Sequence, residues 1–163
     1  MARNLFQAAL EVLDEGGNAV LVTIVSAEGF VPVSATNKLL VTSTGTLMGR
    51  SGSDALDADI RAEAQRVMAQ GPPSPRQFSV LDKDAVASGW YRAWTAELLI
   101  EPLQEQGREI LRALVALEDT GHRGTLMTIL TEHPQYPTGQ RKLLVCDDGT
   151  MVGGLGDVQL EVT

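Results

Sequence analysis

The chain has 163 residues, of which 44% are apolar, so it is long enough to form one globular domain with its own core. Its 13 basic and 21 acidic residues give a net charge of −8, which disfavours binding to nucleic acid or to an anionic membrane. No apolar run has the length of a membrane span, and the N-terminus lacks the apolar region of a secretion signal. The single cysteine, Cys146, excludes an internal disulfide and a multi-cysteine metal site. We therefore expect a cytoplasmic protein without membrane insertion.

The first part of the chain predicts a helix, a buried strand and a hairpin. Apolar residues recur at helical spacing over 5–13, and two glycines end this pattern at 16–17. The β-branched run at 19–25 is typical of a strand that is buried on both faces. After a loop over 26–37, a hairpin follows at 38–48, with its turn at Ser43-Thr44-Gly45.

A long helix is predicted after the hairpin, with Ser53 or Asp54 as its N-cap. Its apolar face carries Leu56, Ile60, Ala64, Val67 and Met68. A stiff proline-rich connector at 71–75 ends it. The later elements are expected to be a short strand at 78–80, a helical turn at 82–88, a strand at 95–101 and an amphipathic helix at 104–119.

Several segments of the chain occur twice. Leu21-Val-Thr-Ile-Val25 returns as Leu126-Met-Thr-Ile-Leu130, and Lys38-Leu-Leu-Val41 returns as Lys142-Leu-Leu-Val145. Gly45-Thr-Leu-Met-Gly49 likewise returns as Gly149-Thr-Met-Val-Gly153. This spacing predicts an α/β fold in which two related helix–strand–hairpin units share one core, with a mixed sheet and flanking helices. As a single domain, 1–163 would hold a first repeat at about 5–70, an insert at 71–103 and a second repeat at about 104–163.

The segment Gly49-Arg50-Ser51-Gly52-Ser53-Asp54 is the first candidate site. A glycine-containing turn from a strand into a helix exposes backbone N–H groups at the positive helix end, which can bind an anion. The segment matches neither the phosphate-loop nor the dinucleotide glycine spacing, and Asp54 would repel an anion. The alternative is a capped helix that glycines join to a strand.

An aromatic cluster at Gly89-Trp90-Tyr91-Arg92-Ala93-Trp94 is the second candidate. Its rings could stack on a planar ligand while Arg92 holds an anionic group. The alternative is that both tryptophans fill the core or an oligomer interface.

Groups suited to catalysis are sparse, so we expect no enzyme. His122 and His133 lie in predicted loops, and Asp147-Asp148 beside Cys146 disfavour a reactive thiolate. No Gly-x-Ser-x-Gly motif occurs. Acidic residues on the long helix are interpreted as a solvated face; these are Asp57, Asp59 and Glu63.

The order of these motifs resembles the XdhC/CoxI family, accessory proteins for maturation of xanthine dehydrogenase and carbon monoxide dehydrogenase. The resemblance covers about residues 5–160 and is limited to the family's N-terminal region. The motifs that carry it are Leu-Val-Thr-Ile-Val-Ser-Ala-Glu-Gly (21–29), Pro32, Lys-Leu-Leu-Val-Thr (38–42), Gly-Thr-Leu-Met-Gly (45–49), Leu-Asp-Ala-Asp-Ile (56–60) and Glu-Leu-Leu-Ile-Glu-Pro-Leu (97–103).

The resemblance implies a chaperone-like role in which molybdenum cofactor (molybdopterin) is bound, protected and handed to a molybdenum hydroxylase. Many family members carry a further Rossmann-like domain, which we do not expect within these residues. Both motif cysteines of the family are absent here. Gly52-Ser53-Asp54-Ala55 stands where the family has Gly-Gly-Gly-Cys, and Arg92-Ala93-Trp94 stands where it has Cys-Gly-Gly. A role that needs a thiolate is therefore not expected.

The candidate cofactor-binding residues are Gly49, Gly52, Ser53, Asp54, Arg92 and Trp94. If the two motifs converge, Asp54 and Arg92 could form an ion pair that closes the pocket. Two functions stay open on this basis: a divergent accessory protein that binds or delivers the cofactor, and a scaffold or interaction protein that has lost the cofactor site. Free strand edges predict a homodimer.

Overall fold

A computed structural model describes residues 4–29, 37–70, 74–81, 93–130 and 141–156. The chain divides into two compact units, Asn18–Pro102 and a second unit formed by Met1–Gly17 together with Leu103–Thr163. The predicted α/β class is confirmed. The sheets differ in detail from the expected mixed sheet, because the described strands form two separate sheets and all of their pairings are antiparallel. The short turns at 43–46 and 147–150 permit only antiparallel pairing of the strands that they join.

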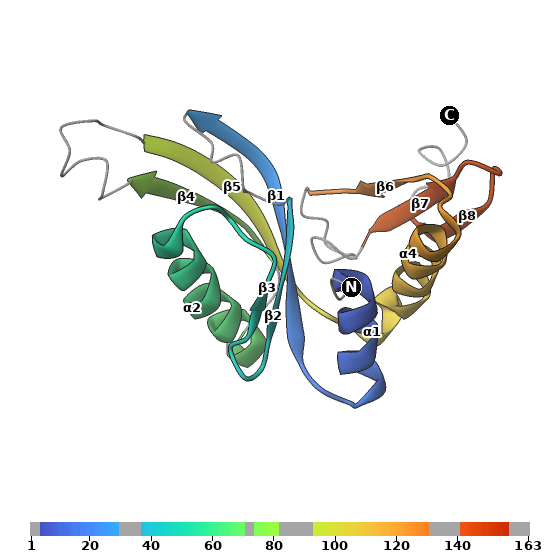
Figure 1. Ribbon diagram of the computed structural model, residues 1–163, viewed down its shortest axis with the longest axis horizontal. Helices are drawn as coiled ribbons and strands as arrows, with labels where there is room; N and C mark the ends of the chain where they lie inside the picture. Colours follow the sequence, from blue (N-terminus) through green and yellow to red (C-terminus); the bar gives the residue numbers. More distant parts are fainter. Residues whose placement is uncertain (1–3, 30–36, 71–73, 82–92, 131–140, 157–163) are drawn as a thin grey trace. The chain divides into compact units, whose positions relative to one another are not determined.

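The Asn18–Pro102 unit is a sheet with one long helix on it (Figure 1). Its strands lie in the order β3-β2-β1-β5-β4. The bounds are β1 Ala19–Gly29, β2 Lys38–Thr42, β3 Leu47–Met48, α2 Asp54–Gln70, β4 Ser74–Leu81 and β5 Ala93–Pro102. The helix and the hairpin turn lie where the sequence predicts them.

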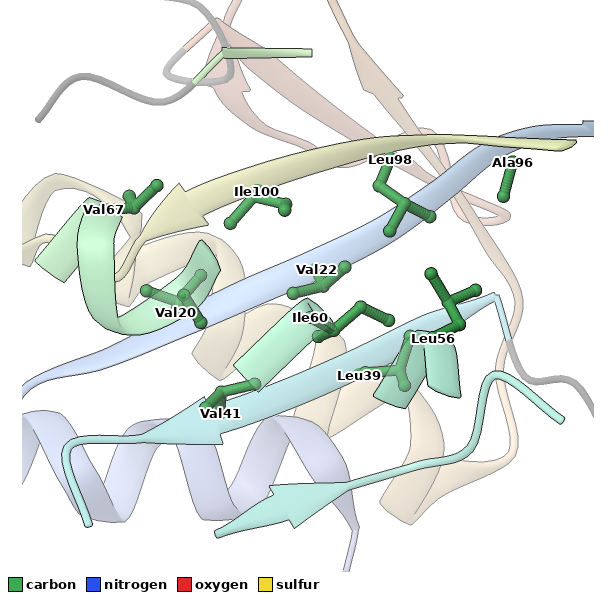
Figure 2. Packing of buried hydrophobic residues seen from close by; sticks show 11 residues of the cluster. Val20, Val22, Leu39, Val41, Leu56, Ile60, Val67, Ala96, Leu98 and Ile100 are labelled. Carbon is green, nitrogen blue, oxygen red and sulfur yellow. The ribbon is translucent and has the colours of Figure 1, made fainter. Parts of the chain in front are cut away.

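The core of this unit lies between the sheet and α2 (Figure 2). Alternate residues of three strands face the helix, and the apolar residues of the helix, which recur at helical spacing, face the sheet. The strand residues are Val20, Val22, Leu39, Val41, Ala96, Leu98 and Ile100, and the helix residues are Leu56, Ile60, Ala64 and Val67. The intervening Leu21, Leu40 and Leu99 are also buried. The strand predicted at 19–25 is therefore buried on both faces only over 19–22, since Thr23 and Ile24 are half-buried and Val25 is 37% exposed.

Two strands extend beyond their predicted limits. β1 continues to Gly29 through a register shift between Ile24 and Ser26, where the sequence predicts a loop. β4 begins at Ser74 and includes Pro75, which the sequence assigns to the connector. Proline is tolerated there because β4 is an edge strand, where a missing N–H costs no ladder hydrogen bond. The helical turn expected at 82–88 lies outside the described residues.

The second unit contains two packed helices and a sheet in the order β6-β7-β8. The bounds are α1 Leu5–Asp14, the 3-10 turn η1 Glu105–Gly107, α4 Arg108–Thr120, β6 Gly124–Thr128, β7 Lys142–Cys146 and β8 Met151–Gly154. The Asn4 side chain caps α1 by accepting the Phe6 N–H at 2.8 Å. Arg108 binds both Asp14 and Glu105, so one guanidinium ties the end of α1 to the start of α4. None of the helices in the described ranges is long and apolar enough to span a bilayer.

Candidate functional site

The turn from β3 into α2 is the best-defined polar feature of the first unit. Gly49 and Gly52 adopt φ values of 90° and 86°, a region that residues with a Cβ rarely occupy. Two such glycines let the chain reverse direction over few residues and enter the helix at Asp54. The sequence therefore predicted the location of this turn correctly.

Side chains hold the turn together from inside. Ser51 is fully buried, and its N–H donates to Asp57 Oδ1 at 3.1 Å. Its hydroxyl donates to the Ser53 carbonyl at 3.0 Å and accepts the Ser53 N–H at 3.3 Å. Ser53 Oγ accepts the Leu56 N–H at 3.3 Å, so Ser53 is the N-cap of α2, one of the two alternatives that the sequence left open.

These bonds limit what the turn can offer to an anion. The N–H groups of Ser51, Ser53 and Leu56 are engaged by side chains, and the Asp57 N–H donates to the Ser53 carbonyl at 2.9 Å. A phosphate would have to displace these acceptors to use the same donors. The arrangement is that of a capped helix joined to its strand by glycines.

Asp57 has a role that the sequence did not reveal. It was interpreted as part of a solvated acidic face, but its side chain accepts the hydrogen bond from Ser51, and the residue is only 9% exposed. Asp59 is exposed as expected, and Glu63 pairs with Arg66 at 2.6 Å. The sequence feature that could have indicated this hydrogen bond is a serine six positions before an aspartate, with a glycine-containing turn between them.

The start of β5 lies at the same end of the first sheet as this turn. Trp94 pairs with Gly29, the last residue of β1. Two residues further along β5, Ala96 belongs to the core cluster that also contains Leu56 from the first turn of α2 (Figure 2). The backbone of Trp94 and the Gly49–Asp54 turn thus lie toward the same end of this sheet. Arg92 lies outside the described residues, so its pairing with Asp54 stays a prediction.

Among the described residues, the remaining candidate groups are His122 and its neighbour Asp147. His122 Nδ1 lies 3.3 Å from Asp147 Oδ2, and both side chains are exposed. The Arg123 N–H and His122 hold the pKa of Asp147 below its usual value. Within the described ranges, no three His, Cys, Asp or Glu side chains gather where they could hold a metal ion. His133 lies outside those ranges.

Comparisons with known proteins agree with the motif order. Residues 12–79 match the model of the XdhC and CoxI family, which confirms the resemblance seen in the sequence. The matched residues run from the end of α1 into β4 and include the Gly49–Asp54 turn. Comparison with curated proteins gives no match.

The fold is similar to that of a solved structure. The crystal structure of a xanthine dehydrogenase from Bacillus halodurans aligns with a TM-score of 0.65 and 16% sequence identity. The alignment covers 95% of this chain and 46% of that protein, so this chain spans about half the length of the structure it matches.

Proposed function

We propose that this chain is a non-catalytic accessory protein in the maturation of a molybdenum hydroxylase, acting in the cytoplasm as a homodimer. The observation that carries the proposal is the match of residues 12–79 to the XdhC and CoxI family, because the matched residues include the turn at Gly49–Asp54. The shared fold with a xanthine dehydrogenase structure supports it. The sparse catalytic groups fit a protein that binds and transfers rather than reacts.

The proposed ligand is molybdenum cofactor, a pterin with an anionic phosphate. Gly49, Gly52, Ser53 and Asp54 would form one wall of the site, and the start of β5 would supply Trp94 for stacking against the pterin ring. Since the Ser51, Ser53 and Leu56 N–H groups already donate to side chains of this region, we assign the phosphate to Arg92. When bound, the cofactor would bring the redox chemistry of the target enzyme, while this chain would contribute binding and protection from water.

The alternative is a scaffold or interaction protein of the same fold that has lost the cofactor site. Two observations support this alternative. The N–H groups of Ser51, Ser53 and Leu56 are already hydrogen-bonded, and Ala55 and Arg92 stand where the family has its two cysteines. Both functions predict a protein partner, but only the first predicts direct cofactor binding.

A fluorescence titration separates the two. Trp90 and Trp94 are the only tryptophans of the chain, so quenching on addition of isolated molybdenum cofactor reports on the proposed site. For a carrier we expect saturable quenching with a Kd of about 10 μM or tighter. Arg92→Ala should weaken binding at least about tenfold, the scale of one lost charge-assisted hydrogen bond.

Arg112→Ala is the matched control, because it removes an exposed arginine from α4 in the other unit. Unchanged affinity in this variant would show that the effect of Arg92→Ala is local. Absence of saturable quenching in the unmodified chain would contradict cofactor binding and leave the scaffold function.

A further inference from the structure

The described strands form two sheets whose edges are β3, β4, β6 and β8, and three of these edges discourage pairing with another chain. β3 consists of only 2 residues, Leu47 and Met48. β4 contains Pro75, which has no N–H to donate, and β8 contains Gly153, whose φ of 92° departs from an extended strand. Short length, proline and local irregularity are the usual means by which edge strands avoid pairing with a further strand.

β6 has none of these protective features. It runs over Gly124–Thr128 without a proline, a charged side chain or a glycine of positive φ. Gly124 and Thr125 are exposed, and Met127 is 39% exposed. Within the described ranges, β7 is the only strand that pairs with it. β6 is therefore a regular, uncharged edge that can accept a further strand.

The hydrogen bonds at the two ends of β6 show which of its backbone groups point toward β7. The Arg123 carbonyl accepts the Asp147 N–H at 2.9 Å, and the Ile129 N–H donates to the Arg141 carbonyl at 3.0 Å. Because backbone groups alternate in direction along a strand, the odd-numbered residues of β6 bond to β7 and the even-numbered residues point away from it. The N–H and C=O groups of the even-numbered residues therefore line the outer edge of the sheet.

We infer that β6 pairs antiparallel with β6 of a second copy of this chain, which joins the two β6-β7-β8 sheets across a two-fold axis. The inference rests on the homodimer of the proposed function and assigns its interface. With the axis at Leu126, Gly124 lies opposite Thr128 of the second copy, and Leu126 lies opposite its own counterpart. All of these residues have outward N–H and C=O groups, so each opposed pair can exchange both of its backbone hydrogen bonds. The edge is thus complementary to itself.

The side chains of β6 are compatible with the same pairing. In this register, Thr125 lies opposite Met127 of the second copy. The two residues would form a pair without mutual backbone hydrogen bonds, with their Cα atoms about 4.5 Å apart, and this contact would cover part of the exposed Met127 side chain. Since β6 carries no charged residue, the two-fold axis brings no like charges opposite each other.

Sedimentation velocity of the full chain tests the pairing. We expect a dimer with a Kd of about 10 μM or tighter. Thr125→Lys combined with Met127→Lys should weaken it about tenfold or more, because lysines of the two copies then lie opposite each other. Thr125→Lys combined with Met127→Glu should keep the Kd within about threefold of the unmodified chain, because each lysine then lies opposite a glutamate of the second copy.

Met151→Lys is the matched control, because Met151 is 58% exposed on β8, at the opposite edge of the same sheet. It should leave the Kd unchanged. Thermal melts of every variant separate a lost interface from lost folding. If the variant with two lysines does not fold, Met127→Glu alone replaces it, and Thr125→Lys should restore the dimer that this substitution weakens.

Two results would overturn the inference and leave the homodimer itself standing. One is a dimer that the charged substitutions on β6 do not weaken, and the other is a dimer that Met151→Lys weakens instead. A folded chain that stays monomeric at about 100 μM would overturn both the interface and the homodimer. Cofactor binding is measured independently by the fluorescence titration, so its failure would not affect this interface.

Discussion

At the scale of single residues, buried polar atoms and glycines decide the local geometry. Ser51 and Asp57 hold the turn before α2 through a hydrogen bond between a backbone N–H and a carboxylate. Gly153 lies where any side chain would collide with its surroundings, since a Cβ would be 2.4 Å from the Lys142 carbonyl oxygen. Both features predict large effects from small substitutions.

Replacing Asp57 tests the turn. Asp57→Ala would leave the N–H of buried Ser51 without its acceptor, so we expect a loss of about 1–3 kcal/mol in the free energy of unfolding, measured with urea. Asp57→Asn retains an acceptor oxygen and should recover most of that loss. Equal destabilisation by both variants would show that the carboxylate charge, rather than the hydrogen bond, stabilises the turn.

Replacing Gly153 tests the packing of β8. Its φ of 92° and the closeness of Ile110 and the Lys142 carbonyl make Gly153→Ala destabilising by about 2 kcal/mol or more. Gly107→Ala is the control, because a Cβ there would meet nothing within 4 Å. A change of Tm for Gly107→Ala as large as that for Gly153→Ala would contradict this explanation.

Acid should weaken the contact between Asp147, His122 and the Arg123 N–H. Because the pKa of Asp147 is lowered in the folded chain, its contribution to stability is present above its unfolded pKa and is lost as the pH falls through the folded value. We expect Asp147→Asn to lower Tm at pH 7 and to reduce the fall in Tm between about pH 5 and pH 3. Glu15→Gln, an exposed acid after α1, should not change that slope.

At the scale of elements, α2 shows how much of the structure can be predicted from the sequence. Its apolar spacing predicted the helix and the face that packs on the sheet, and the cap residue was one of two candidates. β4 was predicted too short because prolines usually interrupt strands, and its tolerance of Pro75 depends on its place at the sheet edge. Position in a sheet is set by tertiary pairing, which local sequence does not encode.

The same limit applies to the candidate site. Glycine spacing located the turn, whereas the hydrogen bond of the Ser51 N–H depends on the Asp57 side chain, which folds back from the first turn of α2. A carboxylate on a helix is normally solvated, so the sequence favoured that interpretation. Only the geometry identifies it as a buried hydrogen-bond acceptor.

The apolar face of α2 that packs on the sheet should contribute most to the free energy of unfolding of the first unit. Ile60 is 0% exposed within the core cluster, so Ile60→Ala should cost about 2–5 kcal/mol. The neighbouring Asp59→Ala, at an exposed position, should change the free energy of unfolding by less than about 0.5 kcal/mol. Urea unfolding of both variants checks the difference, and similar values would mean that α2 does not form the core described above.

At the scale of the whole molecule, the two units differ in what the sequence comparison covers. The family match at 12–79 lies mostly in the Asn18–Pro102 unit, whereas β6, β7 and β8 lie outside it. The first unit therefore contains most of the residues on which the proposed relation to molybdenum hydroxylase maturation rests.

The path of the chain has a consequence for the order of folding. The first unit is one continuous segment, while the second joins residues up to Gly17 to residues from Leu103 onward. During synthesis, β1 to β5 can pair as soon as Pro102 has emerged. Because α1 packs on α4, the helix that is synthesised first packs only after residues 108–120 have been made. Pulsed hydrogen exchange during refolding should accordingly protect β1 and β5 before α1, because the continuous unit closes without help from the rest of the chain.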